Sequence, residues 1–563
     1  MATKTLKEKL LSKTEKKEGF FHKWGTVFVL SLALAIILID ATLLNVSLSV
    51  LIKDLNTDIQ SLQWVITAYS LTIAALTITG GRLGDLFGRK KMFIIGAVLF
   101  AIGSFIASIS MNVPTMIIGE SIIEGIGAAL MMPATASLLV SKYKGRDRGI
   151  AFGIWGGVAA AASAIGPLLG GYLTTNFSWR WGFRINIVVA IILILGSFVI
   201  KEYRDKEEKP SLDWVGVILS SFGMLAVVYG IIESSTYGWW TAKKSFEVFG
   251  KSIDFAWGLS IAPYAILVGS ILIALFLIWE RRIERIGKTP LVSIHLFQNR
   301  QFVSGMTTTA IMALGQAGLI FSIPVFLQAV RGQDAFHTGL ALLPMSLTAL
   351  IVAPIGGFLT HKYSPKLFIQ IGLACTALAY IVLYYTLAVT SVATDFIPAF
   401  ILMGLGMGLT MASISNLTLS AVSPEQSGEA SGVNNTFRQV GATLGTAIIG
   451  AIMLTAISTN LSAGIEASKV IPANFKSFAD AMVSSQSSAV EFGGGAKLPK
   501  IFAKPITDEI TAISHNAITD ANKEALGYTI IFAFVGLLSS FWLPKGTNFE
   551  KEISLASPQK VKE

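Results

Sequence analysis

The sequence predicts an all-α protein that crosses a membrane many times. Of its 563 residues, 53% are hydrophobic and only 14% are charged, whereas about 25% charged residues is usual for a soluble protein. The apolar residues fall into separate runs of about 18 residues or more, each long enough to cross the hydrocarbon layer as a helix. Backbone groups inside a bilayer must be hydrogen bonded within the chain, so we expect these runs to be transmembrane helices.

We count fourteen such runs. Fourteen helices of about 20 residues would use about half of the chain. Two runs flank residues 79–91, and two more lie between residues 148 and 201. The others are expected at residues 24–50, 114–140, 215–232, 262–279, 302–330, 339–360, 368–389, 397–422, 432–457 and 526–543.

Basic residues gather at alternate ends of the runs. Lysines crowd residues 1–23, and Lys and Arg recur at 89–91, 142–148 and 281–288. Positive charge marks cytoplasmic loops, so an even number of spans would leave both termini in the cytoplasm, with the protein in the plasma membrane. The net charge of +10 is attributed to this topology, and no nucleic-acid partner is expected.

A short internal repeat predicts two related halves. Gly80-Gly81-Arg82-Leu83 resembles Gly356-Gly357-Phe358-Leu359 at one constant offset, and His361 in the second copy stands where the first has Asp85. Parallel repeats of this kind place a substrate site between the halves near the midplane. The predicted organisation is a cytoplasmic tail (1–23), a six-span bundle (24–200), two inserted spans (201–288), a second six-span bundle (289–543) and a cytoplasmic tail (544–563).

The second bundle contains one long segment outside the membrane, residues 458–525. Ile506, Ile510, Ile513, Ala517 and Ala521 recur at helical spacing, which predicts an amphipathic helix packed on the outer face. Residues 484–495 are small and polar, and they are expected to form a flexible tip.

Residues 79–91 form the most distinctive stretch, a polar turn expected between two apolar runs. Its glycines allow close backbone approach, and it contains one acid. The stretch resembles the loop between spans 2 and 3 of the major facilitator superfamily, G-x-L-a-D-r-x-G-r-k. The matching positions are Gly81, Leu83, Asp85, Gly88, Arg89 and Lys90.

This resemblance implies a gate. The loop would dock on the second half in the outward-open state, and Asp85 would accept hydrogen bonds from a helix N-terminus or a basic group. We expect its partner near Asn434 and Arg438, at the start of the thirteenth span.

Two further motifs resemble the fourteen-span drug:proton antiporter branch of this superfamily. The first span matches D-x-T-x-x-N-x-A-L-P at Asp40, Thr42, Asn45 and Leu48. The fifth span matches G-x-x-x-G-P-x-x-G-G at Gly166, Pro167, Gly170 and Gly171, with Ala162 replacing the first glycine. Proline removes one helix hydrogen bond, and the glycines give a flat packing face, which suits a helix that moves against its neighbour.

Three acids fall deep within predicted spans: Asp40, Glu120 and Glu124. Each would cost about 2.5–3.5 kcal/mol if it were charged and exposed to lipid, so we expect these acids to bind protons or to recognise a cationic substrate. A purely structural role is the alternative. The family usually has arginine where this chain has Ser121, and Arg184 is a candidate replacement. Gln316 and Asn416 are polar candidates in the second half.

The sequence therefore predicts a proton-coupled exporter that works by alternating access, is not an enzyme and needs no cofactor or metal. It lacks a phosphate-binding P-loop, so ATP is not the expected energy source. The expected partners are protons, membrane lipid and a small amphipathic substrate that is cationic, and the chain is expected to act as a monomer. The alternatives are a transporter of lipids or lipid-linked metabolites and a membrane sensor or scaffold that transports nothing.

Overall fold

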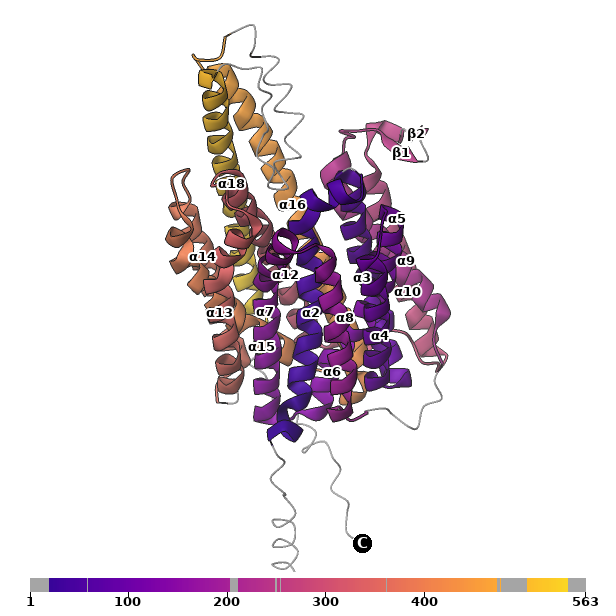
Figure 1. The fold of residues 1–563 in the computed structure, drawn as a ribbon. Helices are drawn as coiled ribbons and strands as arrows, with labels where there is room; N and C mark the ends of the chain where they lie inside the picture. The colour runs from indigo at the N-terminus through magenta and orange to yellow at the C-terminus, as the bar shows by residue number, and fades with distance from the viewer. Residues whose placement is uncertain are drawn as a thin grey trace, which may run out of the picture.

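The computed structural model describes residues 20–57, 59–202, 211–248, 251–253, 255–360, 362–472, 476 and 504–544. These residues include 13 helices that are long and apolar enough to cross a membrane, or 14 when a bent pair in α7 is counted as one span. The helices stand side by side in one bundle (Figure 1). The predicted all-α polytopic fold is thus confirmed.

The first half of the chain runs up and down through the bundle from α2 to α8. Its fourth span is assembled from α5, the π-helical segment η1 and α6, which follow one another without a break. The elements are α2 (Phe20–Asp54), α3 (Ile59–Phe87), α4 (Arg89–Ser108), α5 (Val113–Met116), η1 (Ile117–Glu124), α6 (Gly125–Lys142), α7 (Gly145–Asn176), α8 (Arg180–Gly196) and η2 (Ser197–Val199).

Two further helices, α9 (Trp214–Tyr237) and α10 (Ile261–Arg285), separate this half from the next. The aromatic segment between them contains a small antiparallel hairpin and one 3₁₀ turn, formed by β1 (Phe246–Val248), β2 (Lys251–Ile253) and η3 (Ala256–Gly258). The second half comprises α11 (His295–Gln298), α12 (Arg300–Ala329), α13 (Ala335–Leu359), α14 (Pro365–Thr386), η4 (Ala393–Phe396), α15 (Ile397–Leu419), η5 (Pro424–Gln426), α16 (Ser427–Ala467) and α18 (Lys504–Ser540).

The turn predicted at residues 79–91 is much shorter than expected. Helices α3 and α4 are separated by Gly88 alone, which has a φ of +108°. Residues with a side chain rarely adopt this φ, and a Cβ at this position would also meet the Glu202 carboxylate. That carboxylate accepts hydrogen bonds from the amides of Lys90 and Lys91, both at 3.1 Å, and so satisfies the first turn of α4.

The prediction for the long outer segment was partly wrong. Helices α16 and α18 are 41 and 37 residues long, and they project together beyond the rest of the bundle (Figure 1). The amphipathic stretch continues directly into the last span as α18, and it packs on the extension of α16, where Gly464 admits Ile513. The two long helices bury each other's apolar stripes in this way, and Ile510 and Ala517 also join one buried cluster with Phe326 and other side chains of the bundle. Residues 484–495 lie outside the described residues.

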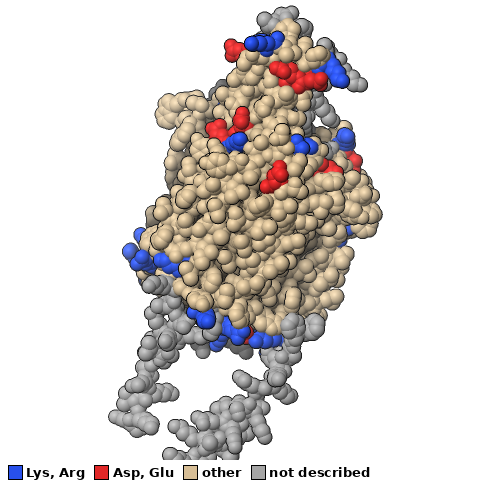
Figure 2. All heavy atoms as spheres, turned by 90° about the vertical axis from the view of Figure 1, so that its left-hand side faces the viewer, with Lys and Arg blue, Asp and Glu red and all other residues tan. Residues whose placement is uncertain are grey.

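Charge separates the two ends of the molecule. In Figure 2, the charged side chains at the lower end are mainly Lys and Arg, those at the upper end are a mixture of basic and acidic residues, and the middle of this face is nearly free of charged side chains. This lower end is where α2 begins and α18 ends (Figure 1), and we call it the terminal side. The uncharged middle has the character of a surface that contacts lipid.

Candidate functional site

The predicted gating stretch lies against the start of α16. Asp85 accepts hydrogen bonds from the backbone N–H of Gly428 at 3.1 Å and of Glu429 at 2.8 Å. Both amides belong to the first turn of α16, where N–H groups have no partner within the helix and the helix dipole favours negative charge. Arg89 also donates to Asp85 at 2.7 Å and to the carbonyl oxygen of Glu425 at 3.0 Å. The two halves are therefore joined at the terminal side.

Glycines make this approach possible. A Cβ at Gly81 would collide with the carbonyl oxygen of Gly428, and one at Gly432 would lie 3.2 Å from the Cα of Ile78. Neither Asn434 nor Arg438 takes part in this contact, contrary to the expectation from the sequence. Both lie further along α16 and face a central cavity.

A second set of contacts joins the segment after α10 to the start of α16. The sequence did not indicate these contacts. The Glu429 carboxylate accepts a hydrogen bond from the amide of Ser293 and lies 3.8 Å from the Arg82 guanidinium. Glu284 accepts from the Ser293 hydroxyl at 2.8 Å, and Glu280 accepts from another amide of the segment at 3.0 Å. The inserted pair α9 and α10 is thereby fastened to the contact between the halves.

The three membrane acids form one buried cluster inside the first half. Asp40 of α2, together with Glu120 and Glu124 of η1, has an exposure of 1% or less. Asn186 of α8 bridges two of them, because its amide nitrogen donates to Asp40 at 2.6 Å and to Glu124 at 3.1 Å. The π-helical geometry of η1 is a feature often found at functional sites.

This cluster has no basic partner among the described residues. None of the ion pairs there involves Asp40, Glu120 or Glu124, and one oxygen of each carboxyl group is buried without a hydrogen-bond partner. Like charges this close inside a membrane repel strongly. The arrangement therefore suits carboxyl groups that hold protons.

Arg184 does not replace the missing arginine of the fourth span. It is exposed and stacks on the Trp181 ring at 5.1 Å, whereas the cluster is bridged by Asn186, two residues further along the same helix. Ser121 donates to the carbonyl oxygen of Val65 at 2.7 Å and so ties η1 to α3. An asparagine in an otherwise apolar span was the signal that could have identified the bridging residue.

The Gly-Pro motif of the fifth span lies beside this cluster. Helix α7 bends by 41° between Ala162 and Ile165, close to where Pro167 removes a hydrogen bond. A Cβ at Gly166 would collide with the Thr42 hydroxyl, and one at Gly170 would meet Leu43; Gly171 is also buried. The flat face of α7 thus packs on the turn of α2 that carries Asp40.

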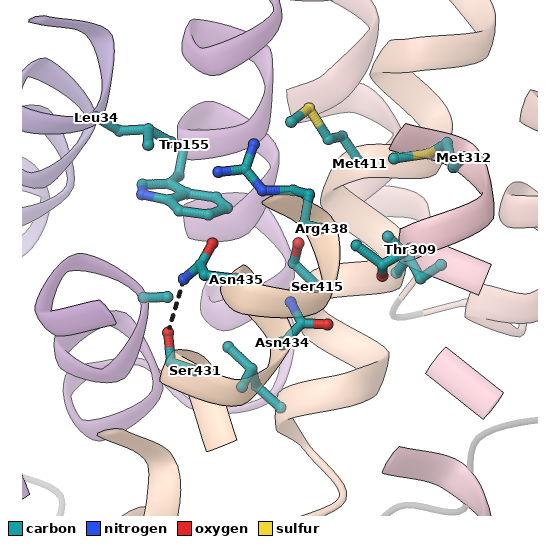
Figure 3. Close-up of a pocket in the computed structure, with 13 residues that line it drawn as sticks. Leu34, Trp155, Thr309, Met312, Met411, Ser415, Ser431, Asn434, Asn435 and Arg438 are labelled. Carbon is teal, nitrogen blue, oxygen red and sulfur yellow. Dashed lines mark hydrogen bonds between the residues drawn. The ribbon is translucent and has the colours of Figure 1, made fainter. Parts of the chain in front are cut away.

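A small central cavity lies between the two halves (Figure 3). Its volume is about 10 Å³, which is room for about one water molecule. Six helices supply its lining, and among the described residues Arg438 is its charged member. The lining consists of Leu34, Ala136, Trp155, Thr309, Met312, Met411, Ile414, Ser415, Leu419, Ser431, Asn434, Asn435 and Arg438.

The remaining candidates are not part of this lining. Gln316 is buried, with its amide nitrogen unpaired, and Asn416 is half-buried next to Ser415. The side chain of Asn45 lies outside the described part of the structure. The three acids also lie off the cavity, so the structure separates them from the space between the halves.

A larger cavity of about 310 Å³ lies on the other side of α16. Helices α3, α9 and α10 and the segment after α10 complete its lining, which is apolar except for Ser220 and Arg281. Val433 and Phe437 of α16 face this side cavity, whereas Asn434 and Arg438 face the central one. Helix α16 therefore forms the wall between the two.

The two halves joined through paired helices, together with a cavity between them, define a transporter of the major facilitator type. The sequence profile of the Major Facilitator Superfamily matches residues 30–446, and the chain belongs to this family. Similar curated proteins and solved structures of this fold are transporters rather than enzymes.

Similar proteins agree with this assignment. Multidrug resistance protein Stp of Mycobacterium tuberculosis is 26% identical, with 92% of each chain covered. Multidrug transporter protein MdtP of Bacillus subtilis is 28% identical over 78% of this chain and 76% of the relative. The proton:xylose symporter XylE has the same fold, with a TM-score of 0.54 at 12% identity over 95% of this chain and 99% of that one. The resemblance to the fourteen-span drug-exporting branch is confirmed.

Proposed function

We propose that this chain exports amphipathic small molecules in exchange for protons by alternating access. The drug-exporting relatives support the export of small molecules. The terminal side would face the cytoplasm, since basic residues gather there and positive loops stay inside. We place the protein in the plasma membrane as a functional monomer with both termini in the cytoplasm.

The observation that carries the proposal is the carboxyl pair bridged by Asn186. Asp40 and Glu124 share one amide donor in a buried, apolar setting, where the charged and neutral forms of an acid differ by several kcal/mol. Protonation from outside would neutralise the pair, and deprotonation towards the cytoplasm would restore its charge. Since α7 packs on the turn of α2 that holds Asp40, a change in this pair would alter how α2 and α7 fit together.

The contact between Asp85 and α16 would be the cytoplasmic gate of this cycle. It is closed here, and the central cavity is too small for a drug-sized molecule. Opening would require the carboxylate of Asp85 to leave the first turn of α16, where its charge is stabilised by the helix N-terminus. A substrate that binds the open form more tightly would shift the balance towards opening.

Reconstituted vesicles test the proposal. With a pH gradient imposed, the wild-type protein should concentrate a fluorescent drug and move protons only when the drug is present. Asp40→Asn should abolish concentrative transport and leave exchange without a gradient, because the carboxyl that binds the proton is gone. Glu124→Gln should change the pH dependence, since removal of one of two coupled acids alters the titration of the other.

Glu233→Gln is a matched control, because Glu233 is a buried acid of the inserted span α9 and lies outside the cluster. It should leave coupling unchanged. If Asp40→Asn still concentrates drug while Glu120→Gln or Glu124→Gln cannot, the proton site lies in η1 and Asp40 is structural. If vesicles with the wild-type protein move protons equally well with and without the drug, antiport is contradicted.

The side cavity favours a second candidate, a transporter of lipids or lipid-linked metabolites. Its volume of about 310 Å³ falls within the range of about 300–1,000 Å³ that is common for ligand pockets. Its lining is apolar except for Ser220 and Arg281, which suits an acyl chain with a polar end. Vesicle assays with a lipid-linked sugar in place of the drug separate the two candidates, and a protein that moves neither would be a sensor or scaffold.

A further inference from the structure

Arg438 points into the central cavity, and no acid among the described residues lines that cavity with it. Its guanidinium group contacts the sulfur of Met132 at 3.5 Å, and none of the ion pairs in the described residues involves it. The polar groups around it are neutral and come from Thr309, Ser415 and α16 itself. Figure 3 shows its guanidinium group beside the Trp155 ring, within the space between the halves.

A guanidinium group in this cavity lacks the opposite charge that usually offsets the cost of removing it from water. Removal of a charge from water costs several kcal/mol unless an opposite charge and hydrogen bonds replace the water. The cavity has room for only about one water molecule, and its lining contains no acid among the described residues. The fixed fork of donors on arginine matches carboxylate and phosphate groups, which it often binds with two parallel hydrogen bonds.

The placement of Arg438 follows from the pattern of α16. Ser431, Asn434 or Asn435, and Arg438 are three or four residues apart, so they share one face of the helix. The opposite face carries Val433 and Phe437, which line the apolar side cavity. Arg438 and its neutral polar neighbours therefore occupy the face of α16 that lines the central cavity.

We propose that the central cavity recognises the anionic group of an amphipathic substrate, a carboxylate, phosphate or sulfonate, through Arg438. The amide of Asn434 or Asn435 adds hydrogen-bond donors. The substrate's apolar body lies against the Trp155 ring and the flexible side chains of Met312 and Met411, a surface that adapts to varied shapes. This inference rests on the proposed function, because it names the substrate class of the same transport site, and it replaces the cationic substrate that the sequence suggested.

Binding measurements on the purified full chain test the inference with three probes that share one ring system. The probes are 2-anthracenecarboxylate, its methyl ester, and an anthracene that carries a trimethylammonium group. The wild-type protein should bind the carboxylate most tightly. Arg438→Gln should weaken carboxylate binding about 10- to 100-fold, as expected for the loss of hydrogen bonds to a charged group, and should change ester binding by less than about twofold.

Two further variants separate recognition from folding. Arg438→Lys keeps the charge but loses the fork, so it should restore part of the carboxylate affinity. Arg184→Gln removes an exposed arginine that lies off the cavity, and it should bind all three probes as the wild type does. Equal weakening of all three probes by Arg438→Gln, tighter binding of the trimethylammonium probe by the wild type, or no measurable carboxylate binding would each overturn the inference.

These measurements need no gradient and no transport. If the carboxylate binds through Arg438 but vesicles show no proton-driven export, the proposed function fails and the inference about the cavity stands. If export is proton-driven but Arg438→Gln leaves carboxylate binding unchanged, the inference alone fails.

Discussion

The two halves of the molecule meet in two related helix pairs that are built differently. In the first pair, α3 and α16 approach through Gly81 and Gly428; in the second, α13 and α7 approach through Gly357 and Gly149, where a side chain would again collide with a carbonyl oxygen. The internal repeat places Gly357 at the position of Gly81, so the same close packing occurs twice.

The pairs differ in what surrounds the glycines. The first is held by the carboxylate of Asp85 on the first turn of α16. In the second, Arg146 stacks on the Phe358 ring at 4.3 Å, and the residue in the place of Asp85 is His361, which lies outside the described residues.

The second pair also extends to the far end of the bundle. A side chain at Gly339, near the other end of α13, would meet the backbone of Leu168 in α7. Charged hydrogen bonds at one end of a helix pair can break and re-form, whereas packing along a whole pair resists separation. In the proposed alternating-access cycle, the first pair would act as the gate and the second as the hinge.

The largest effect is expected when the first pair cannot close. In Gly81→Ala the new methyl group would collide with the backbone of Gly428, and overpacking of this kind costs about 1–3 kcal/mol. Export in vesicles should fall by about tenfold or more at matched insertion. Gly84→Ala is the control, since its Cβ would lie 3.6 Å from the nearest atom, and it should export normally.

A glycine-to-alanine change in the second pair tests whether the two pairs differ in role. Gly357→Ala should lower the yield and thermal stability of the folded protein rather than its rate per folded molecule. Equal export by Gly81→Ala and Gly84→Ala would show that closure of the first pair does not limit the cycle.

Removal of the charge from the gate should have the next largest effect. Asp85→Asn keeps the shape of the side chain but weakens two hydrogen bonds to α16 and the pair with Arg89. Hydrogen bonds to charged groups contribute about 1.5–3 kcal/mol, so export should fall by about tenfold while insertion stays normal. Labelling of a cysteine placed at the terminal side should increase as the gate opens. Normal export rates would remove Asp85 from the gating role.

A smaller effect is expected from the segment that fastens the inserted spans. Glu429→Gln weakens the hydrogen bond from Ser293 and the interaction with Arg82, and export should fall about two- to tenfold, as expected for loss of about 0.5–1.5 kcal/mol. Glu425→Gln is the control, because that side chain is exposed and only its carbonyl oxygen is used. Indistinguishable transport by the two variants would mean that α9 and α10 do not assist the gate.

The smallest effect on stability is expected from a substitution at the far end of the second pair, where α13 begins. Asp334 caps α13 by accepting from the amide of His337 at 2.8 Å, and this backbone hydrogen bond is the main reason why the pKa of Asp334 lies below its ordinary value. Since the carboxylate is exposed, Asp334→Ala should lower the thermal midpoint by only about 1–2 °C and leave export unchanged.

The pH dependence of this cap has a definite sign. A lowered pKa means that the charged form stabilises the fold, so the contribution is complete above the ordinary pKa of aspartate and is lost as pH falls through the folded value. The difference between variant and wild type should shrink as pH falls below about 4. A difference that does not shrink below about pH 4 would assign the stabilisation to another group.

The sequence by itself determined the fold class and singled out the stretch around Asp85 that joins the two halves. Hydropathy is a local property, so runs of about 20 apolar residues specify membrane helices without knowledge of their neighbours. The glycines around Asp85 also indicate close helix packing without knowledge of the partner helix, because only residues without side chains permit such packing. The two long helices α16 and α18 were missed as continuous units, since polar helices outside the membrane give no hydropathy signal.

Tertiary structure decided which distant residues share a site. Asp85 meets an amide 343 residues further along the chain, and Asn186 joins acids from two other helices; no local pattern specifies such partners. The face that a helix turns towards a cavity is likewise set by the packing of all its neighbours. For this reason Arg438, expected beside Asp85 at the gate, lies in the central cavity, and the acids expected to meet a substrate lie within one half.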